Sequence, residues 1–172
     1  LGAVVNAMKG IAAARTGMAH TQLTAVDTYA MTVATAMASA GRPAMPAFNV
    51  RREVNPRKLG MLVFCAEQGF AGAFSERVLD KLGENFDQET LFIIGTRGLY
   101  IAETRGVTPM WNAAMPSHTL SIPKLADKIT QEIYRQVNEG RISHLDVLFT
   151  GWESSRPAVV RQSLFPINVS DL

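Results

Sequence analysis

Two short glycine-containing segments are the places in this sequence where chemistry could most easily occur. They are Gln68–Gly72 and Gly95–Gly98, and each lies between an apolar run and a helical pattern. A strand–glycine–helix junction of this kind can hold a phosphate group against the N-terminus of the helix. Neither segment completes the glycine fingerprint of a dinucleotide site or of a P-loop. The pattern therefore favours glycines that only turn a strand into a helix, with a nucleotide or flavin site as the alternative.

The other reactive side chains do not form a catalytic or metal-binding set. Cys65 ends an apolar run with no histidine near it in the sequence, so we expect a buried, unreactive thiol. Three histidines fall on separate elements, without the spacing of metal ligands: His20, His118 and His144. Three carboxylates are better explained by a solvated face near a helix N-terminus than by an acid–base pair: Glu67, Glu76 and Asp80. The sequence therefore predicts no catalytic residue, no metal site and no cofactor.

The composition is that of a folded domain and excludes several classes of protein. The chain has 172 residues, of which 47% are hydrophobic, and this is enough to build a core. A net charge of +2, without a basic block interleaved with aromatic residues, argues against nucleic-acid binding. The single cysteine excludes an internal disulfide and suits a reducing compartment. No apolar run approaches the ~20 residues that span a bilayer.

The first forty residues carry an apolar stripe at helical spacing. Its members are separated by three, four or seven positions: Val4, Met8, Ile11, Met18, Ala25, Tyr29, Val33 and Ala36. No proline interrupts residues 1–41, so the pattern predicts one helix over 1–40, about 60 Å long at ~1.5 Å per residue. Soluble monomers seldom leave such a stripe open. We expect it to pair with another helix, with a second copy of the chain, or with the chain itself by folding back.

The remaining sequence predicts a connector followed by an α/β domain. Residues 41–58 are rich in proline, arginine and lysine and read as a linker, and 59–172 form the domain. Apolar runs predict strands, the third an edge strand because it contains Pro109: 59–65, 91–95, part of 107–115, 145–151 and 158–165. Helices are expected over 75–86 and 122–138, with a short helix or turn over 96–106. Strands that alternate with helices predict a largely parallel sheet.

Two stretches of the chain carry a resemblance to a known family. The first is VVNAMKGIAAAR (4–15), which resembles the family's first-helix signature I-T-K-A-M-x-M-V-A-A-x-K, with Arg15 in place of the last lysine. The second is CAEQGFAGAFS (65–75), in which Gly69, Gly72 and Phe74 match the family's S-D-R-G-L-C-G-G-F-N.

Two later stretches extend this likeness over almost all of the sequence. FIIGTRGLYI (92–101) resembles the family's I-G-x-K-G strand and turn, and residues 145–167 resemble its strand pair ending in Q-L-L-P-[IL]. The chain thus resembles the gamma subunit of the rotary (F-type) ATP synthase, the central shaft of the catalytic head. Departures at Gln68, Ala71 and Ala73, and the helix glycines Gly10 and Gly17, point to a divergent or alternative type.

The resemblance implies a Rossmann-like domain beside a long antiparallel coiled coil, of which residues 1–40 form one half. The other half would be the family's C-terminal helix, expected just after Asp171 and not present in this sequence. Because the sequence does not begin with Met, we expect it to be part of a longer protein. The residues implied in interactions are these: Met8, Ile11, Arg15, Met18, Gly69 and Gly72. Met8 and Arg15 would contact the coil or the head, or would only pack within the coil.

The function that the resemblance implies is that of a non-catalytic rotor subunit. Proton or sodium flux would turn the shaft, which would change the conformation of the nucleotide sites in the head. The implied partners are the alpha and beta subunits, an epsilon-type subunit and the membrane c-ring, with the protein peripheral to the cytoplasmic face of the energy-coupling membrane. Two alternatives stay open: a free-standing nucleotide- or flavin-binding domain that dimerises through its long helix, and a regulatory or assembly paralogue of the shaft.

Overall fold

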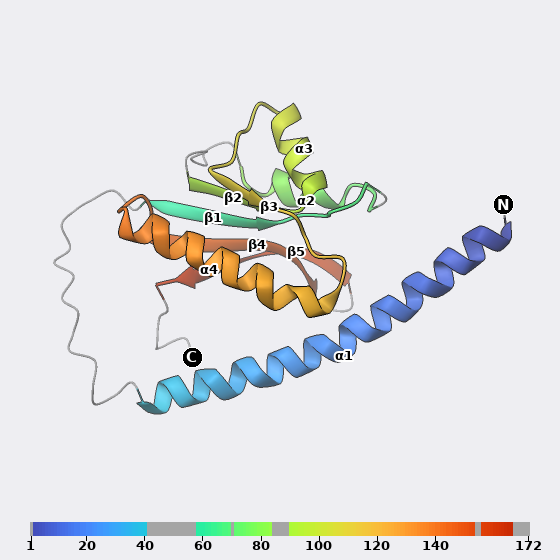
Figure 1. Ribbon diagram of the computed structural model, residues 1–172, viewed down its shortest axis with the longest axis horizontal. Coiled ribbons are helices and arrows are strands. Elements are labelled where there is room, and N and C mark those ends of the chain that lie inside the picture. Colours follow the sequence, from blue (N-terminus) through green and yellow to red (C-terminus); the bar gives the residue numbers. More distant parts are fainter. Residues whose placement is uncertain (1, 41–57, 70, 84–89, 154–155, 167–172) are drawn as a thin grey trace. The chain divides into compact units, whose positions relative to one another are not determined.

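The computed structural model describes residues 2–40, 58–69, 71–83, 90–153 and 156–166. The chain divides into two units, a single long helix and a sheet domain, and each is described by itself (Figure 1). The predicted linker at 41–58 lies outside the described residues except for Lys58.

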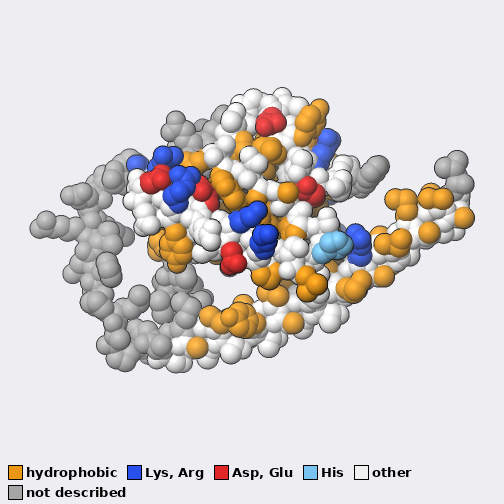
Figure 2. Space-filling model, in the orientation of Figure 1, with side chains coloured by type: hydrophobic (Ala, Val, Ile, Leu, Met, Phe, Trp, Pro, Cys, Tyr) orange, Lys and Arg blue, Asp and Glu red, His pale blue; other side chains and the backbone are white. Residues whose placement is uncertain are grey.

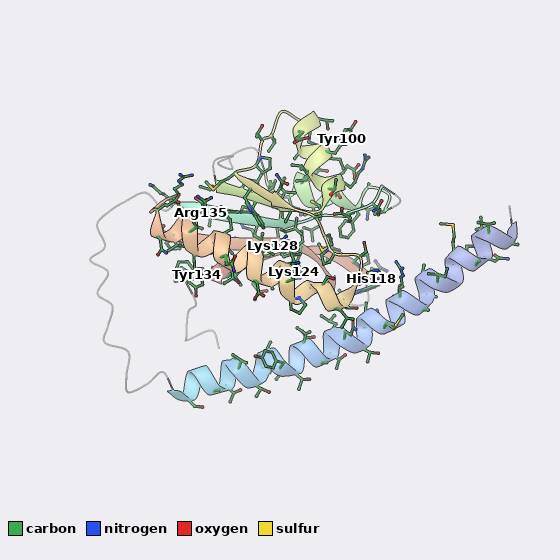
Figure 3. All side chains as sticks on the ribbon, in the orientation of Figure 1. Tyr100, His118, Lys124, Lys128, Tyr134 and Arg135 are labelled. Atoms are coloured by element: carbon green, nitrogen blue, oxygen red, sulfur yellow. The ribbon has the colours of Figure 1, made fainter. Side chains whose placement is uncertain are left out.

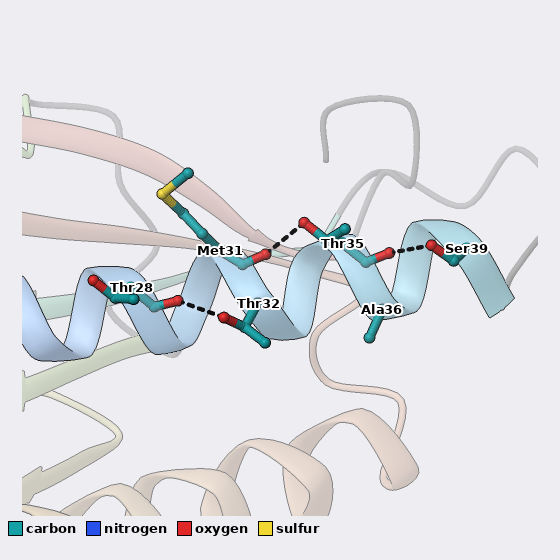
Figure 4. Close-up of a pocket in the computed structure, with 6 residues that line it drawn as sticks. All are labelled: Thr28, Met31, Thr32, Thr35, Ala36 and Ser39. Atoms are coloured by element: carbon teal, nitrogen blue, oxygen red, sulfur yellow. Dashed lines mark hydrogen bonds between the residues drawn. The ribbon is translucent and has the colours of Figure 1, made fainter.

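The first unit is helix α1, Gly2–Ala40, which confirms the predicted long helix. It contains no proline and curves gently along its length (Figure 1). Seven hydroxyl groups donate a hydrogen bond to the carbonyl oxygen four residues earlier: Thr16, Thr21, Thr24, Thr28, Thr32, Thr35 and Ser39. Figure 4 shows three of these bonds near the end of the helix. Back-bonding of this type is associated with bent helices, which agrees with the curvature.

The second unit contains a five-stranded sheet in the order β3-β2-β1-β4-β5. Four strands are parallel: β1 (Leu59–Phe64), β2 (Leu91–Ile94), β3 (Trp111–Ala113) and β4 (His144–Glu153). The last strand, β5 (Arg156–Phe165), pairs antiparallel with β4. This arrangement confirms the predicted α/β fold with a largely parallel sheet, and it places the short strand β3 at one edge.

Helices cover both faces of the sheet, which explains why its inner strands are apolar without alternation. On one face α2 (Phe74–Asp80) and α3 (Thr96–Thr104) pack against Met61 and Val63 of β1. On the other face α4 (Ile122–Asn138) packs against Leu62 of β1 and against β2 (Figure 1). A short 3-10 turn, η2 (Thr119–Ser121), precedes α4.

Helix α4 has the predicted bounds and the predicted inner face. Leu125 and Ile129 are buried, and Ile133 and Val137 pack partly buried beside them. A proline in the first turn suits the start of the helix, because a backbone N–H at that position would have no hydrogen-bond partner within the helix. The lysines Lys124 and Lys128 are exposed (Figure 3).

The helix predicted over 75–86 is too long. It ends at Asp80, and the next two N–H groups donate to carbonyl oxygens three residues back, Lys81 to Val78 and Leu82 to Leu79. Gly83 then takes a positive φ of 77°, which turns the chain away from the helix. Leu82 is buried even so, whereas Phe86 lies outside the described residues. The prediction followed the apolar spacing alone and therefore continued the helix through a turn.

Candidate functional site

The candidate interaction residues fall on both units, four on α1 and two in the turn between β1 and α2. On α1 the side chains of Met8, Ile11 and Met18 are 61%, 58% and 60% exposed. Arg15 is also exposed, and its spacing from Ile11 and Met18 places it on the same face of the helix. Figure 2 shows hydrophobic side chains along the length of α1. The helix thus exposes apolar side chains along the predicted stripe, which also contains the permanent positive charge of Arg15. It exposes further apolar side chains outside the stripe, at Val5, Leu23 and Met31.

A second face of α1 was missed by the sequence reasoning. Threonines at 21, 24, 28, 32 and 35 share, by helical spacing, one face beside the apolar stripe, together with Gly10 and Gly17. Their hydroxyl protons are already donated to carbonyl oxygens of the helix itself. The face is therefore made of small side chains with no unused hydroxyl donor. The spacing of these threonines by three and four residues is the signal that could have revealed it.

The turn after β1 contains the other two candidates, Gly69 and Gly72, both exposed. Gly72 has a φ of 56°, in the left-handed region that favours glycine. An added Cβ would meet nothing within 4 Å, so the backbone conformation and not close packing accounts for this glycine. Beside the turn lies a recess of about 270 Å³ lined by Phe74, Arg77 and Val159, among others. Pockets for small molecules commonly have volumes of about 300–1,000 Å³, so the recess is small for a nucleotide.

Glu67 is half-buried and joins three segments, a role that the sequence did not indicate. Its carboxylate accepts hydrogen bonds from the N–H and the hydroxyl of Thr96, at 3.0 and 2.7 Å, and from the N–H of Met115, at 2.8 Å. Partial burial alone would raise the pKa of Glu67, but these bonds stabilise the charged form and hold the pKa below its ordinary value. The carboxylate therefore stays ionised at neutral pH.

The other two carboxylates near this edge are paired with arginines. Asp80 accepts a hydrogen bond from Arg105 at 2.8 Å, and Glu76 lies 3.9 Å from Arg97. Arg97 also lies over the ring of Tyr100. These contacts pair α2 with α3 and with Arg105, the residue that caps its C-terminus.

The second glycine segment is explained by packing. Gly95 has a φ of 107°, and an added Cβ would lie 2.7 Å from the carbonyl oxygen of Ala66. An added Cβ at Gly98 would overlap the Cβ of Cys65. Both glycines allow the start of α3 to lie against the end of β1, which supports the interpretation that they serve the strand-to-helix turn.

Cys65 is buried, as predicted, with 2% of its surface exposed. Burial raises the pKa of its thiol from 9.0 to about 11, opposed by a hydrogen bond with Ser75 and assisted by the nearby charge of Glu76. Because the folded state favours the neutral thiol, its contribution to stability is complete below pH 9 and is lost as the pH rises towards 11.

We expect alkylation of native Cys65 by iodoacetamide at pH 8 to be at least about 100-fold slower than alkylation of the unfolded chain, because only the exposed thiolate reacts. The shift of the pKa from 9.0 to about 11 alone accounts for that factor. Mass spectrometry over time, with and without urea, measures both rates. Equal rates in the two conditions would show that the thiol is accessible and ionised.

Metal and membrane sites are not found in the part of the chain that the structure describes. His20 and His118 are exposed, and His144 lies within hydrogen-bond distance of the Ser143 hydroxyl. The described residues contain no group of three potential metal ligands. Among the described helices, none combines the length and the apolarity that crossing a bilayer requires.

Comparison with known proteins places the chain in a family. A family model described as ATP synthase matches residues 1–171. An ATP synthase gamma chain from Beutenbergia cavernae is 26% identical over 179 residues, which cover 95% of this chain and 59% of the relative. A second ATP synthase gamma chain, from Cutibacterium acnes, is 27% identical over 129 residues, 68% of this chain and 40% of the relative. The chain thus spans at most about three fifths of the length of these relatives. It therefore belongs to the ATP synthase family, as a relative of the gamma chains.

Proposed function

We propose that this chain is the main part of a central-shaft subunit in a proton- or sodium-translocating ATP synthase, and that it catalyses no reaction itself. The observation that carries the proposal is α1. A helix of 39 residues exposes Met8, Ile11 and Met18 by more than half, and such a surface is suited to packing against other helices rather than to chemistry.

The apolar stripe of α1 is the surface on which a second helix would pack. Residues spaced by threes, fours and sevens form the seam of a coiled coil, and the shaft would be an antiparallel pair with α1 as one member. Residues 41–58 would then link the shaft to the domain of 59–172. Arg15 lies within the seam, so its charged group would have to reach its edge or meet an acidic partner.

The shaft would work by contacts that differ between its rotational positions. A ligand or subunit shifts a conformational equilibrium only by binding its states with different free energies. An asymmetric coiled coil, turned by ion flux through a c-ring, would meet the alpha and beta subunits of the head differently at each angle. The sheet domain, with Gly69 and Gly72 in its exposed turn, would lie near the c-ring and an epsilon-type subunit, peripheral to the cytoplasmic face of the membrane.

A nucleotide- or flavin-binding module is the less favoured alternative. The start of α3 is already occupied by the Glu67 carboxylate, and the recess beside the first glycine turn measures about 270 Å³ with one cationic side chain among its lining residues, Arg77. A phosphate chain requires more donors than this. A regulatory paralogue of the shaft would share α1, and only an assay of coupling separates it from a rotor.

One experiment distinguishes the three functions. The whole protein would be titrated with a fluorescent ATP analogue. It would then be co-expressed with alpha and beta subunits and with the membrane subunits, c-ring included, and assayed for ATP hydrolysis coupled to ion transport. We expect no micromolar nucleotide binding, co-purification with the head, and coupled transport. Micromolar binding without co-purification would establish the module instead, and co-purification without coupling would establish the regulatory paralogue.

A further inference from the structure

The carboxylate of Glu67 is unusual because both of its oxygen atoms are held by groups from other elements. One oxygen accepts the hydroxyl proton of Thr96 at 2.7 Å. The other accepts the N–H groups of Thr96 at 3.0 Å and of Met115 at 2.8 Å. None of these donors is a lysine or an arginine, so the negative charge is stabilised by backbone dipoles and a hydroxyl group.

These donors come from the ends of two neighbouring strands. Glu67 follows β1, Thr96 follows β2 and opens α3, and Met115 follows β3. Backbone bonds join the same ends, from Cys65 N–H to the carbonyl of Ile94 and from Gly95 N–H to the carbonyl of Ala113. The Glu67 side chain extends this connection beyond the last residues of the strands.

The environment of the carboxylate has the chemistry of an oxyanion site. In phosphate-binding α/β domains, the first N–H groups of a helix and a nearby hydroxyl point at a negatively charged group at the carboxyl edge of the sheet. At α3 the same types of donor are present, and the atoms that they bind are the two oxygens of Glu67.

We propose that Glu67 is a built-in oxyanion, which occupies the position of an external phosphate at the start of α3 and braces the ends of β1, β2 and β3. The domain thereby keeps the geometry of a phosphate-binding edge while closing it to ligands. This inference does not depend on the rotor function proposed above, because it concerns only the sheet domain and would hold for a rotor or for a regulatory paralogue.

The test measures hydrogen exchange of the two N–H groups that bind the carboxylate. In the full chain carrying Glu67→Ala, we expect the amides of Thr96 and Met115 to exchange at least about tenfold faster, while that of Ile93 in the core does not change. Sodium formate at ~100 mM should restore their protection in this variant, and sodium chloride at equal concentration should not. Formate should leave the unsubstituted protein unaffected, because its site is filled.

Two further variants make the result decisive. Glu103→Ala removes an exposed carboxylate from the same helix α3 and should leave both amides protected. Glu67→Gln keeps the shape but removes the charge and one acceptor, and serves if Glu67→Ala fails to fold. Unchanged exchange of Thr96 and Met115 in the Glu67 variants overturns the brace. Faster exchange that formate does not reverse overturns the oxyanion site.

Discussion

Replacing Gly98 with alanine is expected to lower the free energy of unfolding of the sheet domain by about 3 kcal/mol or more, the upper end of the cost of overpacking. The added Cβ would overlap the Cβ of Cys65 and lie 2.6 Å from its Sγ atom. Cys65 is buried and directly follows β1, so the overlap can be relieved only by a shift of the backbone of α3 or of the end of β1. Chemical denaturation followed by circular dichroism measures the change.

Two other substitutions control this result. Gly17 also lies in a helix, but an alanine there would meet nothing within 4 Å, so Gly17→Ala should add up to about 1 kcal/mol of helix stability. Cys65→Gly removes the clashing Cβ and should recover part of the loss when combined with Gly98→Ala, which a double-mutant cycle quantifies. A Gly98→Ala protein as stable as the parent would mean that α3 is not packed on Cys65 as described.

Placing two negative charges in the apolar stripe of α1 is expected to reduce assembly with the partner subunits at least about 100-fold. In the variant Met8→Asp, Ile11→Asp each carboxylate would enter a helix–helix seam, and an unpaired buried charge costs several kcal/mol. The sheet domain should keep its thermal midpoint, because both positions lie on α1. Quantitative co-purification with alpha and beta subunits measures the effect.

The control carries one negative charge on another face. Ala13 lies on α1 nearly opposite the stripe by helical spacing, so Ala13→Asp should lower assembly far less than the double variant. Equal losses for the two proteins would show that the stripe is not the face that packs, and would remove the main support for the proposed shaft.

Local patterns predicted most of the fold correctly. The bounds of helix α4 were predicted correctly because its apolar residues recur without interruption and Pro123 marks its start. The buried strands were found because runs such as Leu91–Ile94 are apolar at every position. The end of α2 was missed, since Leu82 continues the helical spacing although Gly83 already requires a positive φ.

The role of Glu67 could not be predicted from the sequence. Its hydrogen-bond partners are 29 and 48 positions away, so no spacing rule connects them. Only the pairing of β1 with β2, and of β2 with β3, brings Thr96 and Met115 to the same edge. A carboxylate after a strand suggested a solvated face because that is the common case. For α1 the sequence predicted the helix and its stripe, whereas the partner of that stripe stays a proposal.

The enclosure of Cys65 also makes the protein convenient for optical experiments. As Cys65 is the single cysteine of these 172 residues and is buried, a maleimide dye would find almost no target on this part of the molecule. Asn6, exposed on α1, could be changed to cysteine to give one attachment point. The angular position of α1 could then be followed by polarised fluorescence from individual molecules, without first removing the native thiol.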